Sequence, residues 1–226
     1  MIRDQSGNVL FYILVAVALL AALAYAVSQG SRTTTSGLSA EQARLQAAAI
    51  IEYGNALSQA VTQLKLRGYK ETDISFENSV VSGYTNADCS EDACRVFALD
   101  GGGVSWQSVP ENAMASTSSE WRIGAQMAVK DIGTTCTSAS CSELLAFALD
   151  IKPAVCEQIN TRLGLASPEV TPVDADADYA KFTGSYSYVS TIGGVAGSAD
   201  LAGRSAGCFF STADNIYIYY QVLIAR

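Results

Sequence analysis

The feature that most constrains this chain is an uninterrupted uncharged run from Val9 to Val27. A helix needs roughly 20 apolar residues to cross the hydrocarbon core of a bilayer, and this run is about that long. We therefore expect a transmembrane helix over residues 8–30, preceded by a short leader or cytoplasmic stub, residues 1–7. Charge says little about its orientation, because Asp4 partly offsets the positive charges on the upstream side.

Three fates of this apolar segment stay open, and each predicts a different mature protein. The segment remains in the membrane as an uncut signal anchor, or it is a secretory signal peptide. For the second case, Ala24-Tyr25-Ala26 has the small-x-small form of a signal-peptidase site, with cleavage after Ala26. In the third case a short leader that ends at Gly7 is removed and the apolar helix is kept.

Six cysteines in a chain without histidine indicate disulfides rather than a zinc site. Mixed zinc sites use histidine, and neither close pair of cysteines has the two-residue spacing of a zinc knuckle or a thioredoxin motif. The simplest pairing joins sequence neighbours: Cys89 with Cys94, Cys136 with Cys141, and Cys156 with Cys208. Because such bridges persist outside the cytoplasm, we expect an extracytoplasmic globular domain over residues 69–226 and a cytoplasmic N-terminus.

A second, amphipathic helix is predicted over residues 39–68 from its periodicity. Small and apolar residues recur at alternating spacings of three and four, so they form one seam, and polar residues occupy the opposite face. Ser39 is a suitable N-cap and Gly68 a suitable stop. The seam either covers the core of its own domain or faces other subunits. Its residues are Ala40, Ala43, Ala47, Ile50, Gly54, Leu57, Val61 and Leu64.

The expected fold class is α+β. Weak helix formers between the two helical segments predict a hinge at residues 31–38. Downstream, we expect strands within 72–84, 95–99, 182–189 and 216–224, and helices at 142–149 and 153–163. A long N-terminal helix, with a transmembrane half and an amphipathic half, is then expected to pack on a disulfide-bonded domain with an antiparallel sheet.

Composition and motifs argue against an enzyme and against a nucleic-acid partner. The formal net charge of −8 disfavours phosphate binding, which needs clustered lysine and arginine. Without histidine, no Ser/His/Asp or Cys/His site can be built. Carboxylates alone support glycan hydrolysis in some enzymes, but no pair stands out in this sequence.

Two clusters remain as candidate sites. Asp174, Asp176 and Asp178 alternate in an acidic loop and suit calcium, although Tyr179 and Ser185 occupy the EF-hand positions for glycine and glutamate. A solvated acidic loop is the competing interpretation, and no other cofactor is expected. Aromatic residues near the C-terminus either pack within a sheet or form a sugar-binding or subunit-binding face. These are Tyr186, Tyr188, Phe209, Phe210, Tyr217, Tyr219 and Tyr220.

Residues 1–67 resemble the N-terminal architecture of a type IV pilin or a type II secretion pseudopilin. The shared features are a short leader with Arg3 that ends in Gly7, an apolar helix that follows at once, an amphipathic continuation, and a disulfide-bearing domain. The resemblance implies cleavage by a prepilin peptidase after Gly7, so that Asn8 becomes the first mature residue. It also implies storage in the lipid of the bacterial inner membrane. Like or unlike subunits would then assemble through the N-terminal helix into an extracellular or periplasmic filament.

Two positions depart from the pattern of that family. Asn8 stands where phenylalanine or methionine is usual, and Tyr12 stands where most pilins carry a glutamate. That glutamate neutralises the new ammonium terminus in an apolar filament core, where an unpaired charge costs several kcal/mol. A minor pseudopilin at the filament tip also lacks it. The alternative function is a membrane-anchored or secreted ligand-binding domain, cut after Ala26 or left uncut.

Overall fold

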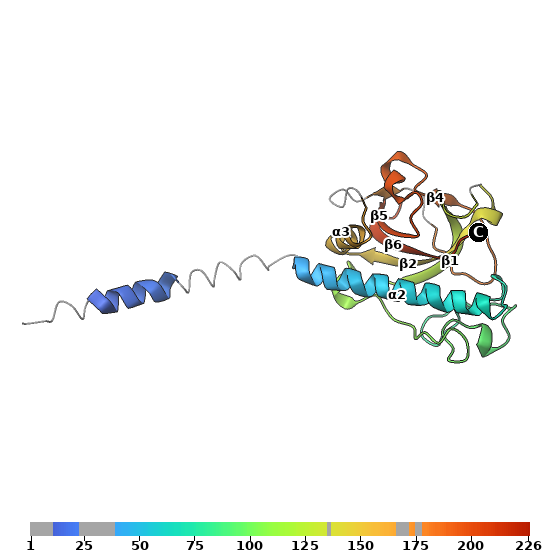
Figure 1. The fold of residues 1–226 in the computed structure, drawn as a ribbon, viewed down its shortest axis with the longest axis horizontal. Coiled ribbons are helices and arrows are strands. Elements are labelled where there is room, and N and C mark those ends of the chain that lie inside the picture. The colour runs from blue at the N-terminus through green and yellow to red at the C-terminus, as the bar shows by residue number, and fades with distance from the viewer. Residues whose placement is uncertain (1–10, 23–38, 135–136, 166–171, 175–177) are drawn as a thin grey trace, which may run out of the picture. The chain divides into compact units, whose positions relative to one another are not determined.

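The computed structural model describes residues 11–22, 39–134, 137–165, 172–174 and 178–226. The chain divides into two compact units, residues 1–39 and Ala40–Arg226. The described part of the first unit is mainly a helix over residues 11–22, and the second unit contains every other described helix and strand (Figure 1).

The prediction of one long N-terminal helix is wrong. The helix over residues 11–22 is much shorter than the predicted span, residues 8–30, and the amphipathic helix α2, Ala40–Leu66, belongs to the other unit. None of the helices described is both long enough and apolar enough to cross a bilayer. Helical stability in proteins comes chiefly from packing of one face, and α2 has such a face against a sheet. The predicted hinge, residues 31–38, lies outside the described residues.

Helix α2 matches the predicted amphipathic segment closely. It ends where Gly68 adopts a φ of +100°, a left-handed conformation that glycine adopts without strain, and the Gly68 amide donates to the Lys65 carbonyl over 3.0 Å. One side of the helix is buried along its whole length. The buried residues are Ala43, Ala47, Ile50, Tyr53, Gly54, Leu57, Ala60, Val61 and Leu64.

A six-stranded mixed sheet forms the centre of the domain, in the order β3-β5-β6-β2-β1-β4. Its strands are β1 Trp121–Val129, β2 Glu143–Ile151, β3 Val173–Asp174, β4 Ser190–Ile192, β5 Ala206–Ser211 and β6 Ile216–Ile224. The four central strands are antiparallel, but β3 runs parallel to β5 and β4 runs parallel to β1. The predicted antiparallel sheet is therefore corrected to a mixed one. Neither parallel pair consists of strands that are consecutive in the chain: β2, α3 and β3 come between β1 and β4, and β4 and η5 come between β3 and β5.

Helices α2 and α3, Pro153–Arg162, pack side by side on one face of the sheet (Figure 1). Tyr219 of β6 points to this face, because an added Cβ on Gly54 of α2 would meet its hydroxyl. The other face carries a second apolar cluster that includes Phe147, Phe209 and Tyr220. With both faces covered, β6 is apolar almost throughout rather than alternating.

Several residue ranges form a different element from the one predicted. Residues 142–149, predicted as a helix, form most of β2, because a short apolar run buried on both faces has no periodicity that separates strand from helix. Residues 95–99 form a turn beside an isolated bridge between Ser75 and Arg95. Residues 182–189 lie along β1 without joining a ladder, with single bonds such as the one from the Val189 amide to the Gln126 carbonyl. The predictions for 153–163 and 216–224 are confirmed as α3 and β6.

The connections contain short 3-10 helices: η2 Asp92–Cys94, η3 Glu111–Ala113, η4 Ala139–Cys141 and η5 Ala196–Leu201. Two disulfides have the predicted pairing, Cys89 with Cys94 in a loop and Cys156 of α3 with Cys208 of β5. Cys141 is also disulfide-bonded, and its predicted partner, Cys136, lies outside the described residues.

Candidate functional site

The helix over residues 11–22 is the first candidate functional surface. It contains no charged residue and its side chains are exposed all round, with Phe11 63% and Leu20 68% exposed. A helix that is apolar on every side is normally buried in a large core or in a membrane. Exposed apolar patches of this size mark sites that another surface covers. We call residues 11–22 the apolar helix.

The processing site predicted from the sequence, Gly7 and Asn8, lies outside the described residues. Tyr12, the position of the family glutamate, falls within the apolar helix and is 65% exposed. Its ring lies edge-on to that of Phe11, with the ring centroids 6.2 Å apart. The side chain therefore extends the apolar surface rather than breaking it.

The predicted assembly seam of α2 faces the sheet of its own domain. Seven of its eight residues are buried there, and Ala40 at the start of the helix is exposed. Gly54 is the closest point: an added Cβ would lie 2.7 Å from the Tyr219 hydroxyl oxygen. The small residues of the seam thus allow a tight approach of helix to sheet, which leaves the opposite face of α2 for any neighbouring subunit.

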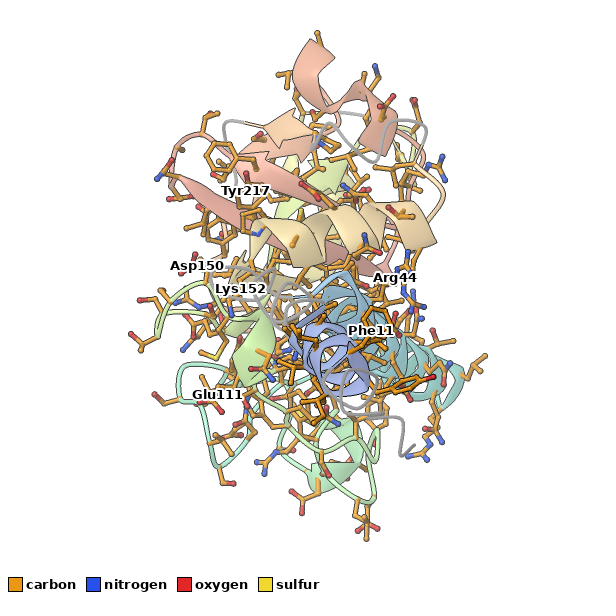
Figure 2. The ribbon with its side chains drawn as sticks, turned by 90° about the vertical axis from the view of Figure 1, so that its left-hand side faces the viewer. Phe11, Arg44, Glu111, Asp150, Lys152 and Tyr217 are labelled. Atoms are coloured by element: carbon orange, nitrogen blue, oxygen red, sulfur yellow. A yellow bond between two sulfur atoms is a disulfide. The ribbon has the colours of Figure 1, made fainter. Side chains whose placement is uncertain are left out.

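That opposite face is small-sided and carries little charge. A groove of about 600 Å³ runs along it beside the end of α3. Its lining residues are Ala48, Ile51, Glu52, Asn55, Ala56, Gln59, Arg162 and Leu163. Nearer the start of α2, the Arg44 guanidinium donates to the Gln158 side chain of α3 over 3.3 Å, at the surface that Figure 2 shows. The two helices present one continuous outer surface.

The two described carboxylates of the acidic loop, Asp174 and Asp178, have different hydrogen-bond partners. Asp174 is buried, where its carboxylate accepts bonds from the Ser198 hydroxyl at 2.7 Å and the Gly193 amide at 3.2 Å. The Asp178 carboxylate accepts from the Ala180 amide at 2.9 Å, and Asp176 lies outside the described residues. Throughout the described ranges, no group of three or more histidine, cysteine, aspartate or glutamate side chains is placed to hold a metal ion.

Three of the seven C-terminal aromatic residues pack in the core, and the other four are half-buried. Phe209, Tyr219 and Tyr220 are fully buried, and burial raises the pKa of both tyrosines far above the usual range. Tyr186 is also largely enclosed, with the Arg226 guanidinium 3.9 Å from its ring centroid. Of the two roles considered for these aromatic residues, these contacts correspond to packing within and against the sheet.

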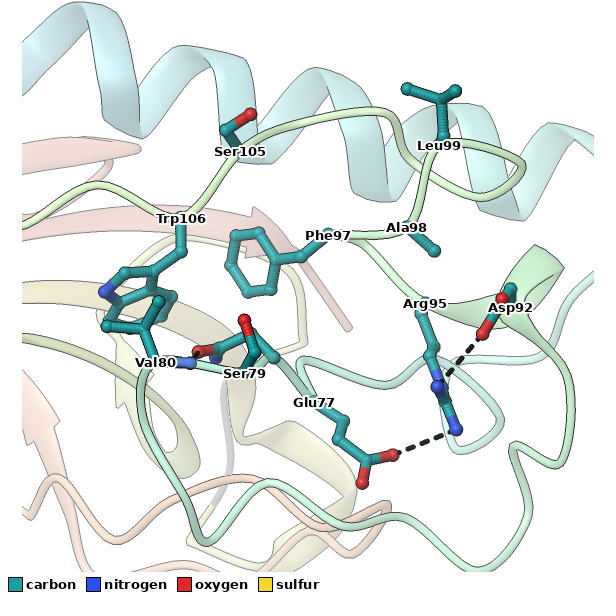
Figure 3. A pocket seen from close by; sticks show the side chains of 11 residues that line it. Glu77, Ser79, Val80, Asp92, Arg95, Phe97, Ala98, Leu99, Ser105 and Trp106 are labelled. Atoms are coloured by element: carbon teal, nitrogen blue, oxygen red, sulfur yellow. Dashed lines mark hydrogen bonds and ion pairs between the residues drawn. The ribbon is translucent and has the colours of Figure 1, made fainter.

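Two features carried no clear sequence signal. Glu143 is a fully buried carboxyl group in β2, where burial raises its pKa to about 7 although one oxygen accepts from the Val129 amide at 2.7 Å. The second feature is a pocket in the long connection between α2 and β1, lined by Trp106 on one side and Arg95 on the other (Figure 3).

No known family model, curated protein or solved structure matches the chain.

Proposed function

We propose that this chain is a pilin-like or pseudopilin-like structural subunit, anchored in the bacterial inner membrane and assembling through its apolar helix into a filament. The observation that carries the proposal is the apolar helix itself, which is uncharged and exposed on every side. Each of its larger side chains gains roughly 1.5–3 kcal/mol on leaving water. The helix therefore needs a partner surface, and lipid before assembly or equivalent helices after assembly supply one.

The globular domain supports the same proposal from its own chemistry. Its disulfides persist in an oxidising compartment, so the domain belongs on the far side of the membrane from the cytoplasm. The outer face of α2 is uncharged from Ala48 to Ile51 and carries one charge, Glu52, in its middle section. A helix face of this kind can approach a neighbour closely without desolvating many charges.

Processing completes the proposal. A prepilin peptidase removes residues 1–7 and leaves Asn8 as the first residue. With Tyr12 in place of the family glutamate, the new ammonium terminus has no intramolecular carboxylate at that position. A subunit at a filament end, where the terminus stays near lipid headgroups or water, tolerates this better than one inside a long filament.

The proposal is tested by placing charge on the apolar helix. Leu14→Glu and Leu19→Glu put a carboxylate among apolar residues, where an unpaired charge is costly in lipid and in a helix-packed core. We expect both variants to leave the membrane fraction and to disappear from the filament fraction released by shear. The matched control is Leu66→Glu, because Leu66 is 84% exposed on α2 of the globular domain.

Membrane sedimentation and assembly that are unchanged in both helix variants would contradict the proposal. Loss of assembly in the Leu66→Glu control as well would also count against it, since a general effect of added charge would then explain the result.

A further inference from the structure

A pocket in the connection between α2 and β1 is separate from the surfaces used for assembly. Its volume is about 610 Å³, within the range of roughly 300–1,000 Å³ that small-molecule sites occupy. The lining comes from three short stretches: residues 77–80, residues 92–99, and Ser105 with Trp106. Figure 3 shows the two sides of this pocket, one apolar and one charged.

The apolar side consists of Phe97, Trp106 and Val80. The two rings meet edge to face with their centroids 5.2 Å apart, and both are only partly buried. Val80 is 70% exposed beside them. Large aromatic side chains left partly open to solvent are a typical feature of binding sites, because they supply contact area with few rotatable bonds.

The charged side consists of Arg95 between two carboxylates. Its guanidinium pairs with Glu77 at 3.2 Å and with Asp92 at 3.0 Å (Figure 3). Each carboxylate uses one oxygen for this pair, and its other oxygen has no bond within the described part of the chain. Each terminal nitrogen of the Arg95 guanidinium carries two N–H groups, so one N–H on each remains after these pairs, whereas the Nε is buried. This wall thus offers both acceptors and donors.

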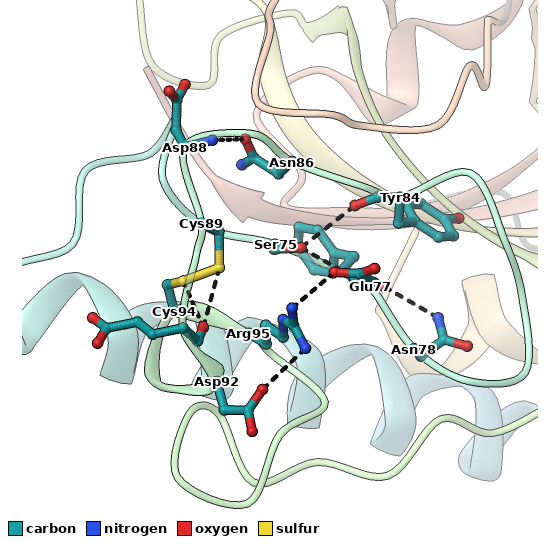
Figure 4. Close-up of polar contacts among 12 residues, drawn as sticks. Ser75, Glu77, Asn78, Tyr84, Asn86, Asp88, Cys89, Asp92, Cys94 and Arg95 are labelled. Carbon is teal, nitrogen blue, oxygen red and sulfur yellow. Dashed lines mark hydrogen bonds and ion pairs between the residues drawn. A yellow bond between two sulfur atoms is a disulfide. The ribbon is translucent and has the colours of Figure 1, made fainter.

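Contacts outside the pocket fix the positions of the residues that line it. The Cys89–Cys94 disulfide closes the loop before Arg95 (Figure 4). The Ser75 amide also donates to the Cys94 carbonyl over 3.1 Å. Buried Phe76 packs against Phe97 with ring centroids 6.2 Å apart. A preformed pocket loses less conformational entropy when it binds a ligand.

Glycine is required behind the pocket at the turn that follows Leu99. An added Cβ on Gly101 would lie 2.0 Å from the Arg95 carbonyl oxygen. The Arg67 guanidinium fastens the same turn to the end of α2 by donating to the carbonyls of Asp100 and Gly101, each over 2.8 Å. The turn therefore fixes the backbone that carries Arg95.

We infer that this pocket binds a neutral sugar. A sugar hydroxyl both donates and accepts, so it can use the carboxylate oxygens and the guanidinium together. The C–H face of the pyranose ring packs on Phe97 and Trp106. Two carboxylates flank one guanidinium, so an anionic ligand would meet an excess of negative charge. A cationic ligand would have to compete with Arg95 for carboxylates that Arg95 already pairs, so the wall favours a polar ligand without charge.

Intrinsic fluorescence gives a direct test, because the chain has two tryptophans in contrasting places. Trp121 is 1% exposed in the core, whereas Trp106 lines the pocket. Titration of the full chain in detergent with lactose, maltose and cellobiose is expected to give a saturable change with at least one of them. Trp121→Phe should keep the change, and Trp106→Phe should lose it.

A second pair of variants tests the charged side. Glu77→Gln keeps the shape but removes a charged acceptor, and we expect binding about tenfold weaker by saturation-transfer NMR. Glu111→Gln, at an exposed carboxylate of η3 outside the pocket, is the matched control and should bind like the parent. Thermal unfolding of each variant checks that the domain is folded.

The inference is overturned if none of the three neutral disaccharides gives a saturable change. It is equally overturned if Glu77→Gln and Glu111→Gln bind alike, or if glucosamine and glucuronic acid bind as tightly as the neutral sugars. A free sugar and a surface glycan share this chemistry. If the protein binds soluble disaccharide but is not retained on a neutral-polysaccharide resin, the ligand is a free sugar. If the protein is also retained on the resin, the ligand is a surface glycan. None of these outcomes depends on filament formation.

Discussion

The contact between Gly54 and Tyr219 allows a quantitative test of why α2 carries small residues. In Gly54→Ala, the new methyl group would lie 2.7 Å from the tyrosine hydroxyl oxygen and 3.1 Å from Cε1. Overpacking of this kind costs about 1–3 kcal/mol, and alanine returns about 1 kcal/mol through its higher helix propensity. Displacing the hydroxyl also weakens its 2.9 Å bond to the Gln221 side chain, worth about 1 kcal/mol. We expect a net loss of about 1–3 kcal/mol in the free energy of unfolding.

A second substitution removes the clash. Tyr219→Phe deletes the hydroxyl oxygen, so the nearest ring carbons to the new methyl group are those at 3.1 and 3.3 Å. In this background Gly54→Ala should be neutral or stabilising by up to about 1 kcal/mol, because helix propensity then outweighs the remaining contact. The two substitutions should therefore couple by about 1–4 kcal/mol.

Urea unfolding of the parent, both single variants and the double variant, followed by circular dichroism, measures this cycle. Additive effects within about 0.5 kcal/mol would refute the reasoning. The reasoning would also be refuted if Gly54→Ala raised the free energy of unfolding in the parent background. The glycine would then be needed for a contact outside the domain and not for the contact with Tyr219.

Three further predictions concern the domain. Asn160→Ala should cost about 2–4 kcal/mol in urea unfolding, because the amide both donates to and accepts from the Cys208 backbone at 2.9 Å, and both backbone groups would be left buried and unpaired. Replacing Cys156 and Cys208 together by serine should cost about 4 kcal/mol of loop-closure entropy; stability equal to the parent would show that the bridge adds nothing. The raised pKa of Glu143, about 7, means that the unfolded chain releases this proton at lower pH than the folded one. Stability should therefore fall as pH rises from about 4.5 to about 7, by on the order of 1–3 kcal/mol, and Glu143→Gln should flatten that slope in unfolding curves across this range.

Features set by local chemistry were predictable from the sequence, and features set by tertiary contacts were not. The periodicity of α2 and its Gly68 stop depend on neighbours within one helix, and both were placed closely. Residues 142–149 were predicted as a helix because an apolar run without periodicity fits either element; burial on both faces made them β2. The partner of the α2 seam was undecidable for the same reason, since only the folded chain brings Tyr219 to Gly54.

The same distinction between local sequence patterns and tertiary contacts applies to the candidate sites. The apolar helix was visible as a run of uncharged residues, although its described length, residues 11–22, is shorter than the run. The pocket was not visible, because Glu77, Arg95 and Trp106 are far apart in the sequence and lie in irregular backbone. Asp174 and Asp178 looked alike as alternating carboxylates, yet Asp174 is buried in β3, where it accepts from the Ser198 hydroxyl, and Asp178 is half-buried and accepts from the Ala180 amide.

The most direct measurement of the central claim is the intact mass of the protein isolated from membranes of cells that contain a prepilin peptidase. A subunit that assembles through its apolar helix is predicted to begin at Asn8, with residues 1–7 removed and the helix retained. A mature chain that begins at Val27 would have lost the apolar helix, and one that begins at Met1 would not have been processed. Either result would contradict the account.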